Sequence, residues 1–325
     1  MYKHILDNIK NPQVFEENRL AAHSDHEFYF DVDEYYRGKS SFIFSLNGFW
    51  KYNYGINFGQ IVEGFEKEEY ICKDWQDIRI PSHIQLEGLD KPHYTNITYP
   101  WDGFESLWSG QIPEKFNPTI SLVKYFTLPK DFDGRLILRM NGVESAVAVW
   151  LNGEYVGYAE DSFTPSEFEI NKYIKDGENK LALLVPKWCA GSWLEDQDFF
   201  RFSGVFRDIY IYREPKLHIR DLDIRTEFNV YGDNANLDIA TLKLNFLASA
   251  SGKAAIRLYE AVDKSDADFM IVNTFDRAKI IDKEISISEG DNTFAYEVNL
   301  PKLWSAEKPM LYTLLIELHK EFKKS

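Results

Sequence analysis

The sequence predicts an all-β protein made of two antiparallel sandwiches. Short apolar runs recur at intervals of roughly 8–12 residues, as they do in sandwiches and jelly rolls. Turn dipeptides separate several of these runs, for example Asn152-Gly153 and Asp176-Gly177. No amphipathic helical pattern of any length lies between them. We therefore expect a jelly-roll β-sandwich before Pro215 and an immunoglobulin-like β-sandwich after it.

The composition limits size, partners and compartment. A chain of 325 residues holds about two domains, and its 44% apolar and 16% aromatic content can fill their cores. The net charge of −15 argues against nucleic acid or an anionic membrane as the main partner. Cys72 and Cys189 are too few for a disulfide framework, and neither a leader peptide nor an apolar span of about 20 residues is visible. We expect a cytoplasmic protein.

Residues 1–40 are expected to form an irregular N-terminal arm, and residues 41–215 the first sandwich domain. Asn47-Gly48 stands between two apolar runs, which predicts a β-hairpin. Residues 81–120 form a long segment rich in proline, glycine, histidine and tyrosine, and loops of that length are usually functional. The expected strands are 42–48, 49–54, 78–80, 121–128, 136–140, 145–151, 155–159, 180–185 and 205–212.

Residues 216–325 are expected to form the second domain, in which the aromatic density is lower. Its strand candidates are 217–224, 237–247, 255–259, 280–287, 294–300 and 312–318. An immunoglobulin-like sandwich normally needs about seven strands. We therefore expect this sandwich to lack its last strand, which would leave one sheet edge open.

The most unusual composition lies in residues 191–208, which combine carboxylates, two arginines and five aromatic side chains. Rings beside carboxylates suit a site that stacks on a sugar face and binds its hydroxyls. The same residues suit an ion-pair cluster that joins two strands, and composition leaves both interpretations open. Asp196 and Asp198 come nearest to a catalytic pair, but they would lie on one wall of a site. Glycoside hydrolysis needs two carboxyl groups that face each other across the bond.

Asn96 is a second candidate, in the long segment 81–120. Its amide can both donate and accept hydrogen bonds, and aromatic residues flank it on both sides. This combination suits the recognition of sugar hydroxyls. It equally suits an asparagine that stabilises its own loop.

Motifs are spread along nearly the whole chain, in residues 18–23, 45–50, 81–88, 93–100, 117–119, 149–158, 161–168, 191–208 and 301–309. The longest of them reads GSWLEDQDFFRFSGVFRD. Each motif alone is weak, whereas their order and spacing together are specific. With these motifs the chain resembles the N-terminal part of bacterial β-galactosidases of glycoside hydrolase family 2. The resemblance implies a galactose-binding-like jelly roll and an immunoglobulin-like domain, followed in the family by a barrel that holds both catalytic glutamates.

By this resemblance, the full enzyme hydrolyses terminal β-D-galactosides, such as lactose, with retention of configuration. The sequence ends before the expected barrel, so the resemblance implies no catalytic residue here and no activity for this part alone. The barrel would act in cis or in trans, and a homo-oligomer is compatible with the family. Three alternatives stay open: a free-standing carbohydrate-binding module, a complementing structural fragment, and, within the family, a β-glucuronidase or a β-mannosidase.

The resemblance also assigns sugar-binding and metal-binding positions. Asn96 matches an asparagine whose amide binds a sugar hydroxyl, and Asp198 matches an aspartate that binds galactose and ligates Na⁺. The ligands of a structural Mg²⁺ would be Asn8, Asn11, the carbonyl of Val14, and Glu160. Ala190 stands where that site has an aspartate. Because further ligands are missing, we expect neither Na⁺ nor Mg²⁺ to be firmly bound to this chain alone.

Overall fold

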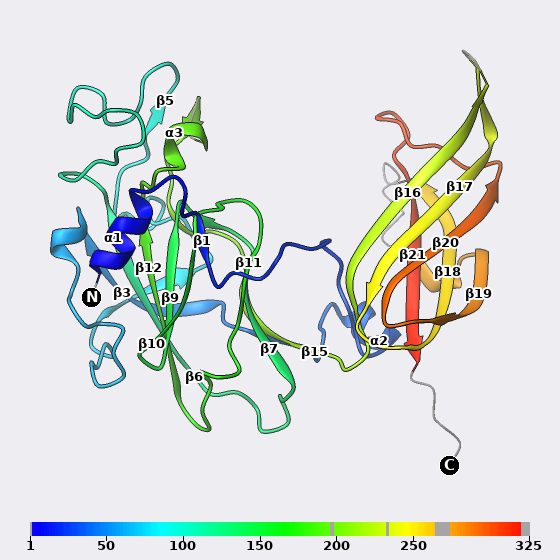
Figure 1. Ribbon diagram of the computed structural model, residues 1–325, viewed down its shortest axis with the longest axis horizontal. Coiled ribbons are helices and arrows are strands. Elements are labelled where there is room, and N and C mark those ends of the chain that lie inside the picture. The colour runs from blue at the N-terminus through cyan, green and yellow to red at the C-terminus, as the bar shows by residue number, and fades with distance from the viewer. Residues whose placement is uncertain (1, 196–197, 232–233, 264–273, 320–325) are drawn as a thin grey trace. The chain divides into compact units, whose positions relative to one another are not determined.

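The computed structural model describes residues 2–195, 198–231, 234–263 and 274–319 of the chain (Figure 1). The chain divides into two compact units. The first contains Met1–Ala22 and Phe28–Glu214, and the second contains His23–Glu27 and Pro215–Ser325. Strands dominate both units, which confirms the predicted all-β class. In the described ranges, no helix has the length and apolar character needed to cross a membrane.

The elements of the first unit run from the N-terminal arm to Glu214. Its helices are α1 (Lys3–Ile9), α2 (Val32–Arg37), α3 (Ser192–Glu195) and the short 3-10 helix η1 (Phe58–Gln60). Its strands are β1 (Glu16–Glu17), β2 (Ile43–Ser45), β3 (Gly48–Gly55), β4 (Gln76–Ile80), β5 (Tyr94–Thr95), β6 (Thr119–Phe126), β7 (Arg135–Met140), β8 (Val143–Glu144), β9 (Val147–Leu151), β10 (Glu154–Ala159), β11 (Ser166–Glu169), β12 (Asn179–Pro186), β13 (Phe199–Phe200), β14 (Gly204–Val205) and β15 (Ile209–Glu214).

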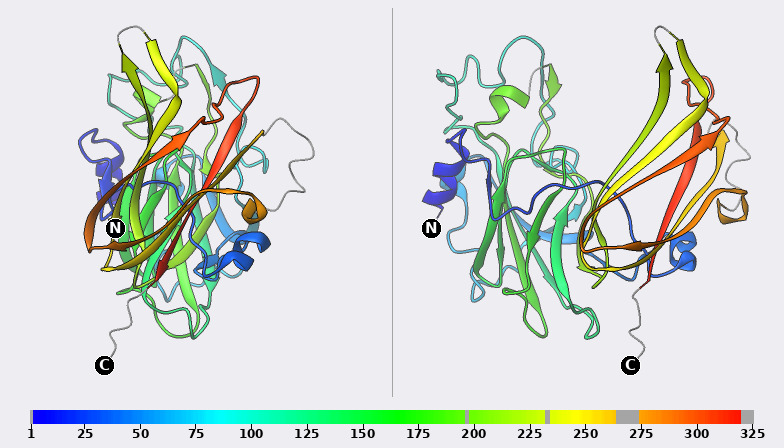
Figure 2. Two further views of the ribbon diagram at one scale, coloured as in Figure 1. Left: turned by 90° about the vertical axis from the view of Figure 1, so that its right-hand side faces the viewer. Right: turned by 45° about the vertical axis from the view of Figure 1, so that its right-hand side comes forward.

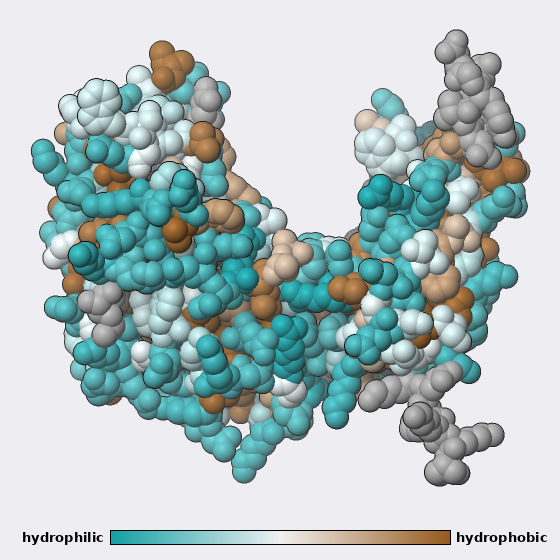
Figure 3. Space-filling view, viewed as in Figure 1, coloured by the Kyte–Doolittle hydropathy of each residue, from teal (hydrophilic) through white to brown (hydrophobic). Residues whose placement is uncertain are grey.

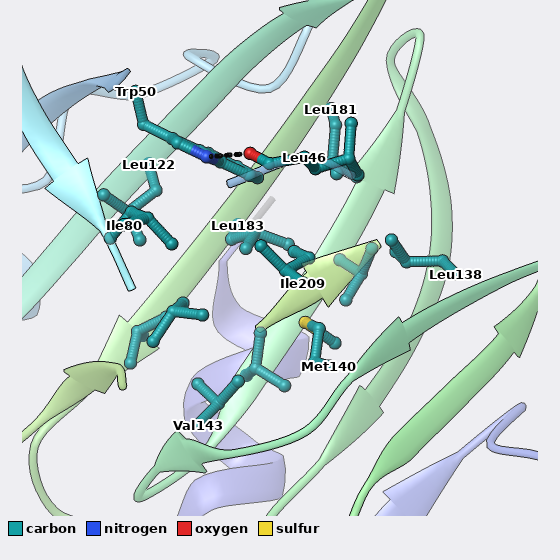
Figure 4. Packing of buried hydrophobic residues seen from close by; sticks show 14 of the residues in the cluster. Leu46, Trp50, Ile80, Leu122, Leu138, Met140, Val143, Leu181, Leu183 and Ile209 are labelled. Atoms are coloured by element: carbon teal, nitrogen blue, oxygen red, sulfur yellow. Dashed lines mark hydrogen bonds between the residues drawn. The ribbon is translucent and has the colours of Figure 1, made fainter. Parts of the chain in front are cut away.

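Two antiparallel sheets form the first sandwich. The larger has the order β1-β10-β9-β12-β6-β3-β4, and the smaller has the order β11-β7-β15-β2. The main core contains Leu138 of β7, Leu183 of β12 and Ile209 of β15, whose side chains lie close together in Figure 4. A second apolar cluster joins Trp150 of β9 to Ile5 of α1. The strand β9 is therefore buried on both faces, as its continuous apolar sequence predicts.

The hairpin predicted at Asn47-Gly48 is wrong, because β2 pairs with β15 whereas β3 pairs with β4 and β6. The chain passes here from one sheet to the other. The Asn47 side chain donates to Asp208 Oδ1 at 2.8 Å and accepts from the Ile209 N–H at 3.1 Å. It therefore binds the start of β15 and does not close a hairpin turn. The hairpin at Asn152-Gly153 is confirmed, since Leu151 pairs with Glu154 across the turn.

The N-terminal arm is not irregular, because it contains two helices and a strand. Ile5 and Ile9 are four residues apart on α1, so they share one face, and both are buried. The helix α2 begins after Asp31, whose side chain accepts from the Glu34 N–H, and ends at Gly38 with φ of 60°. The strand β1 pairs with β10 at the edge of the larger sheet. The strand β11, which the sequence did not indicate, pairs with β7.

The second unit is a smaller sandwich with two sheets. Its strands are β16 (Ile219–Tyr231), β17 (Asn234–Ala248), β18 (Gly252–Asp263), β19 (Lys279–Ile287), β20 (Gly290–Asn299) and β21 (Met310–His319), and η3 (Thr274–Asp276) is a 3-10 helix. The sheet orders are β16-β17-β20 and β19-β18-β21. All six strand candidates are thus present in the described residues, each of them longer than expected. His26 also belongs to this unit, where its ring nitrogen Nε2 lies 2.9 Å from the Ile219 carbonyl.

Candidate functional site

A two-stranded ladder brings the two predicted sugar-binding residues together. In this ladder β5 pairs with β13, and Thr95 is the partner of Phe199. Asn96 directly follows Thr95 and Asp198 directly precedes Phe199, so both residues adjoin this last pair of the ladder. Both residues therefore stand at the same end of the ladder, although about a hundred positions separate them in the sequence. Figures 1 and 2 show β5 and α3 at one end of the first unit, beyond the strands of the sandwich.

Both side chains at this tip, which we define as residues 93–96 and 198–202, are available to a ligand. Asn96 and Asp198 are exposed, and Asp198 has φ of 51°. The hydroxyl of Tyr94 donates a hydrogen bond to Asp198 Oδ1, and this bond raises the pKa of Tyr94. Sequence reasoning missed Tyr94, because β5 contains only Tyr94 and Thr95 and therefore gives no periodic signal. Asp196, the other member of the carboxylate pair considered above, lies outside the described residues.

Aromatic rings surround the tip. The ring centroids of Tyr94 and Phe200 are 5.2 Å apart, and the ring of Phe202 stacks on Phe200 at 5.9 Å. Apolar side chains with at least 80% exposure also lie on these loops, namely Ile97, Phe104, Trp108 and Leu194. Brown atoms mark apolar residues at this upper end of the first unit in Figure 3. Such a surface provides apolar contact beside polar groups, as carbohydrate recognition requires.

Three other charged residues of the 191–208 stretch, Arg201, Arg207 and Asp208, hold the loop in shape. The guanidinium of Arg201, buried to 1% exposure, donates to Thr95 Oγ1 at 3.0 Å. Arg207 donates to the Phe163 carbonyl at 2.7 Å. Asp208 accepts from Asn47. Their partners are thus polar groups of the neighbouring loops, and these contacts support a structural role.

The candidate magnesium ligands are also brought close together, by backbone hydrogen bonds. The Ala190 N–H donates to the Ile9 carbonyl at 2.8 Å, and the Glu160 N–H donates to the Phe15 carbonyl at 3.0 Å. The segment after α1 therefore runs beside positions 160 and 190. Within it, the Val14 N–H donates to the Asn11 carbonyl, and the Asn11 N–H donates to the Asn8 carbonyl.

Glu160 is the only carboxylate of this proposed set. It is buried to 5% exposure and accepts a hydrogen bond from the Tyr158 hydroxyl at 2.5 Å. Burial raises the pKa of Glu160 to about 7, and the charge of Glu195 adds to the effect. Asn8 is buried as well, whereas Asn11 is exposed and accepts from the Gln13 N–H through its side chain. A cation here would offset a desolvated charge, and amide, carbonyl and carboxylate oxygens suit Mg²⁺.

The amino-acid sequence matches models of one known family over both units. Residues 43–215 match the family described as "Glycosyl hydrolases family 2, sugar binding domain", and residues 217–324 match "Glycosyl hydrolases family 2". The chain belongs to glycosyl hydrolase family 2. Its described part contains no group of three or more histidine, cysteine, aspartate or glutamate residues that could hold a metal. The oxygen donors around Glu160 and Asp198 would thus each need ligands of other kinds.

Several relatives carry the name β-galactosidase. The chain is 42% identical to "Beta-galactosidase" of Halalkalibacterium halodurans over 96% of its own length and 30% of the relative. It is 37% identical to "Beta-galactosidase" of Streptococcus thermophilus, covering 98% of itself and 30% of that protein. It is 37% identical to "Beta-galactosidase large subunit" of Leuconostoc lactis, covering 97% and 49%. The chain thus spans between 30% and 49% of the length of these relatives.

Solved structures of the family share the fold. A β-glucuronidase of Bacteroides uniformis superposes with a TM-score of 0.61 at 20% identity, over 87% of this chain and 31% of that one. A β-glucuronidase of Bifidobacterium dentium gives 0.59 at 16% identity, over 86% and 45%. At these identities the likeness shows the two-sandwich fold of family 2 members only. A shared fold does not identify a substrate, which must be argued from the residues of the tip.

Proposed function

We propose that this chain is the non-catalytic N-terminal region of a family 2 β-galactosidase, which hydrolyses terminal β-D-galactosides such as lactose with retention. The placement of Asn96 and Asp198 next to the last pair of the β5–β13 ladder carries the proposal. Relatives named β-galactosidase support it. The two catalytic glutamates belong, in this proposal, to a barrel that acts in cis or in trans. A protein named as a large subunit among the relatives is compatible with action in trans.

In the proposed site, each tip residue has a separate task. The Asn96 amide donates to one sugar hydroxyl oxygen and accepts from another. The Asp198 carboxylate accepts from a hydroxyl and provides one oxygen ligand to Na⁺, which would neutralise part of its charge when bound. The exposed rings of Tyr94 and Phe200 offer apolar contact to a sugar face. Together they bind and orient the galactosyl group, and they take no part in bond cleavage.

The substrate can be tested with the full-length protein that carries this chain. We expect it to cleave p-nitrophenyl β-D-galactoside at a higher kcat/KM than the corresponding β-glucuronide or β-mannoside. This chain alone is expected to cleave none of them. Glu178 is an exposed acid that pairs with Lys73 on the surface. The variant Glu178→Ala therefore serves as a control and should show the same order of substrates as the wild type. A preference for the glucuronide or the mannoside, or cleavage by this chain alone, would contradict the proposal.

A free-standing carbohydrate-binding module is the second candidate, since the exposed tip lies entirely within this chain. Calorimetric titration of this chain with galactose separates the two. Millimolar or tighter binding that disappears in Asp198→Ala would favour the module. Absence of heat at high galactose concentrations, together with hydrolysis by the full-length protein, would support the non-catalytic region.

We propose Mg²⁺ near Asn8, Asn11, Val14 and Glu160 as a structural ion of the full-length enzyme. Mg²⁺ should raise the midpoint of thermal unfolding of the wild-type protein, because it binds the folded state only. Glu160→Gln should abolish this rise.

Both cysteines are free and buried, which supports the proposed cytoplasmic location.

A further inference from the structure

A hydrogen-bonded network of buried polar side chains lies next to the tip. Gln85 accepts from the Ser203 N–H at 2.9 Å, and its side-chain nitrogen donates to Ser203 Oγ at 2.9 Å. The same nitrogen donates to Asp90 Oδ2 at 3.0 Å. Lys187 Nζ donates to the same carboxylate oxygen at 2.5 Å. The side chains of Lys187 and Asp90 are only 1% and 6% exposed, so the ion pair is desolvated.

Each of these polar residues belongs to a segment that leads to the tip or supports it. Asp90 stands six residues before Asn96 in the 81–120 loop, and Ser203 stands five residues after Asp198. Lys187 follows directly after β12. Its backbone is fixed to the sandwich, because its N–H donates to the Pro118 carbonyl at 2.8 Å and its carbonyl accepts from Ser145 Oγ at 2.9 Å. The polar network therefore connects both halves of the tip to the larger sheet.

The tip itself has little regular structure to hold it. The ladder pairs only two residues of β5 with two of β13. Beyond it, the Arg201 N–H donates to the His93 carbonyl at 2.7 Å, and the Ile84 N–H donates to the Ser203 carbonyl at 3.0 Å. Short exposed pairings of this kind open readily. Additional fixed points are needed to keep the Asn96 and Asp198 loops in one register.

A shift that separates Asp90 from Lys187 would leave a charge without its partner in a place that water does not reach, so the pair favours the one arrangement in which the two charges meet. We infer that Asp90 and Lys187, acting through Gln85 and Ser203, are positioning residues that set the spacing of Asn96 and Asp198 and thereby the affinity for the galactosyl group. This inference rests on the proposed function for the identity of the ligand. The positioning itself can be measured without a ligand.

The first test is Asp90→Asn, which removes the charge and keeps a hydrogen-bond acceptor for Gln85. Hydrogen exchange of this chain should become at least about tenfold faster in peptides covering residues 93–96 and 198–202, because the tip loses a fixed point. The matched control is Glu167→Gln. It breaks the buried Arg139–Glu167 ion pair between β7 and β11, whose side chains are 8% and 4% exposed. The control should accelerate exchange in β7 and β11 and leave the tip unchanged. Unchanged exchange at the tip in Asp90→Asn, or equal acceleration there in the control, would overturn the inference.

The second readout is the inhibition constant of galactose in the full-length protein. We expect it to rise about tenfold in Asp90→Asn, comparable to the loss of one well-placed hydrogen bond, and to stay constant in Glu167→Gln. Faster exchange at the tip with an unchanged inhibition constant would refute the link to affinity. A wild-type protein that does not act on galactosides would refute the proposed function alone, because the exchange result would still stand.

A double variant addresses the risk that Asp90→Asn does not fold. In Asp90→Asn combined with Lys187→Met no buried charge is left without a partner, so the thermal midpoint should recover. Exchange at the tip and the galactose inhibition constant should stay raised, because the fixed point is still absent. Recovery of all three quantities to wild-type values would show that the ion pair does not position the tip.

Discussion

The two candidate sites of the first unit differ in their relation to solvent. At the tip, Asn96 and Asp198 are exposed on a ladder of two-residue strands. At the arm, Asn8 of α1 and Glu160 are both buried to 5% exposure, and α1 contributes to an apolar cluster. Exposed polar groups keep their hydration until a ligand arrives, whereas buried ones lose it when the chain folds. The first site should therefore respond to substitution through binding, and the second through stability.

Removal of the Glu160 charge should give the largest effect, in a buffer with a chelator. Burial raises the pKa of Glu160 from 4.5 to about 7, so the folded state keeps a proton that the unfolded state releases between these values. The contribution of Glu160 to the free energy of unfolding then falls as pH rises through this window and levels off above it. Glu160→Gln lacks this loss. Relative to wild type it should gain up to about 3 kcal/mol between pH 4.5 and pH 8, measured by urea unfolding.

The control for this experiment is Glu178→Gln, at an exposed carboxylate. Its stability difference from wild type should stay constant across the same pH range. If Glu160→Gln also follows the wild-type curve at every pH, the two sites do not differ in the way that their burial indicates.

Asp198→Ala should act on binding and leave stability unchanged. Loss of a hydrogen bond to a charged group costs about 1.5–3 kcal/mol, which corresponds to an increase of about 10- to 150-fold in the galactose inhibition constant of the full-length protein. The urea midpoint should stay the same, because Asp198 is exposed and water can replace it as the partner of Tyr94. Na⁺ should improve galactose affinity in the wild type and have no effect in Asp198→Ala. A large drop in stability would show that Asp198 supports the fold.

Gly157→Ala tests whether the proposed Mg²⁺ site around Glu160 depends on the pairing of β1 with β10. A Cβ at position 157 would lie 2.5 Å from the Glu17 carbonyl oxygen and 2.5 Å from the ring of Phe168. The backbone of β1 must therefore move, at a cost of about 1–3 kcal/mol. We expect a lower urea midpoint and a weaker Mg²⁺ effect on thermal unfolding. Exchange at the tip should be unchanged, and a faster rate there would mean that the two sites are coupled.

Most strands of both sandwiches could be predicted from the sequence, because their signals are local, whereas β1 and β11 were not predicted. Alternation and turn dipeptides identify β7, β9, β10 and all six strands of the second unit. Asn152-Gly153 and Asn47-Gly48 show where this reasoning ends. The dipeptides are identical, but the partners of Asn47 are Asp208 and Ile209, about 160 residues away. A dipeptide carries no information about such partners.

The candidate site shows the same division. Motif resemblance marks Asn96 and Asp198 as residues, but β5 and β13 are too short to have any periodicity, so their pairing could not be foreseen. The helix α1 has seven residues and only two apolar pairs at helical spacing, Ile5 with Ile9 and Leu6 with Ile9, which is too little for a helical prediction. Tertiary contacts with Trp150 and its neighbours stabilise it.

Asn96→Ala should give the smallest effect and sharpens the comparison within the tip. A neutral hydrogen bond contributes about 0.5–1.5 kcal/mol, so the galactose inhibition constant should rise about 2- to 10-fold, less than in Asp198→Ala. Asn96→Asp is the matched variant, because it keeps the shape and one acceptor but loses the amide donor and adds charge beside Asp198. It should bind galactose more weakly than Asn96→Ala does at neutral pH, and the difference should shrink at high Na⁺ concentration, which screens the two carboxylates. Equal affinities of the two variants would mean that position 96 contributes contact area only, and that Asp198 alone supplies the polar recognition of this chain.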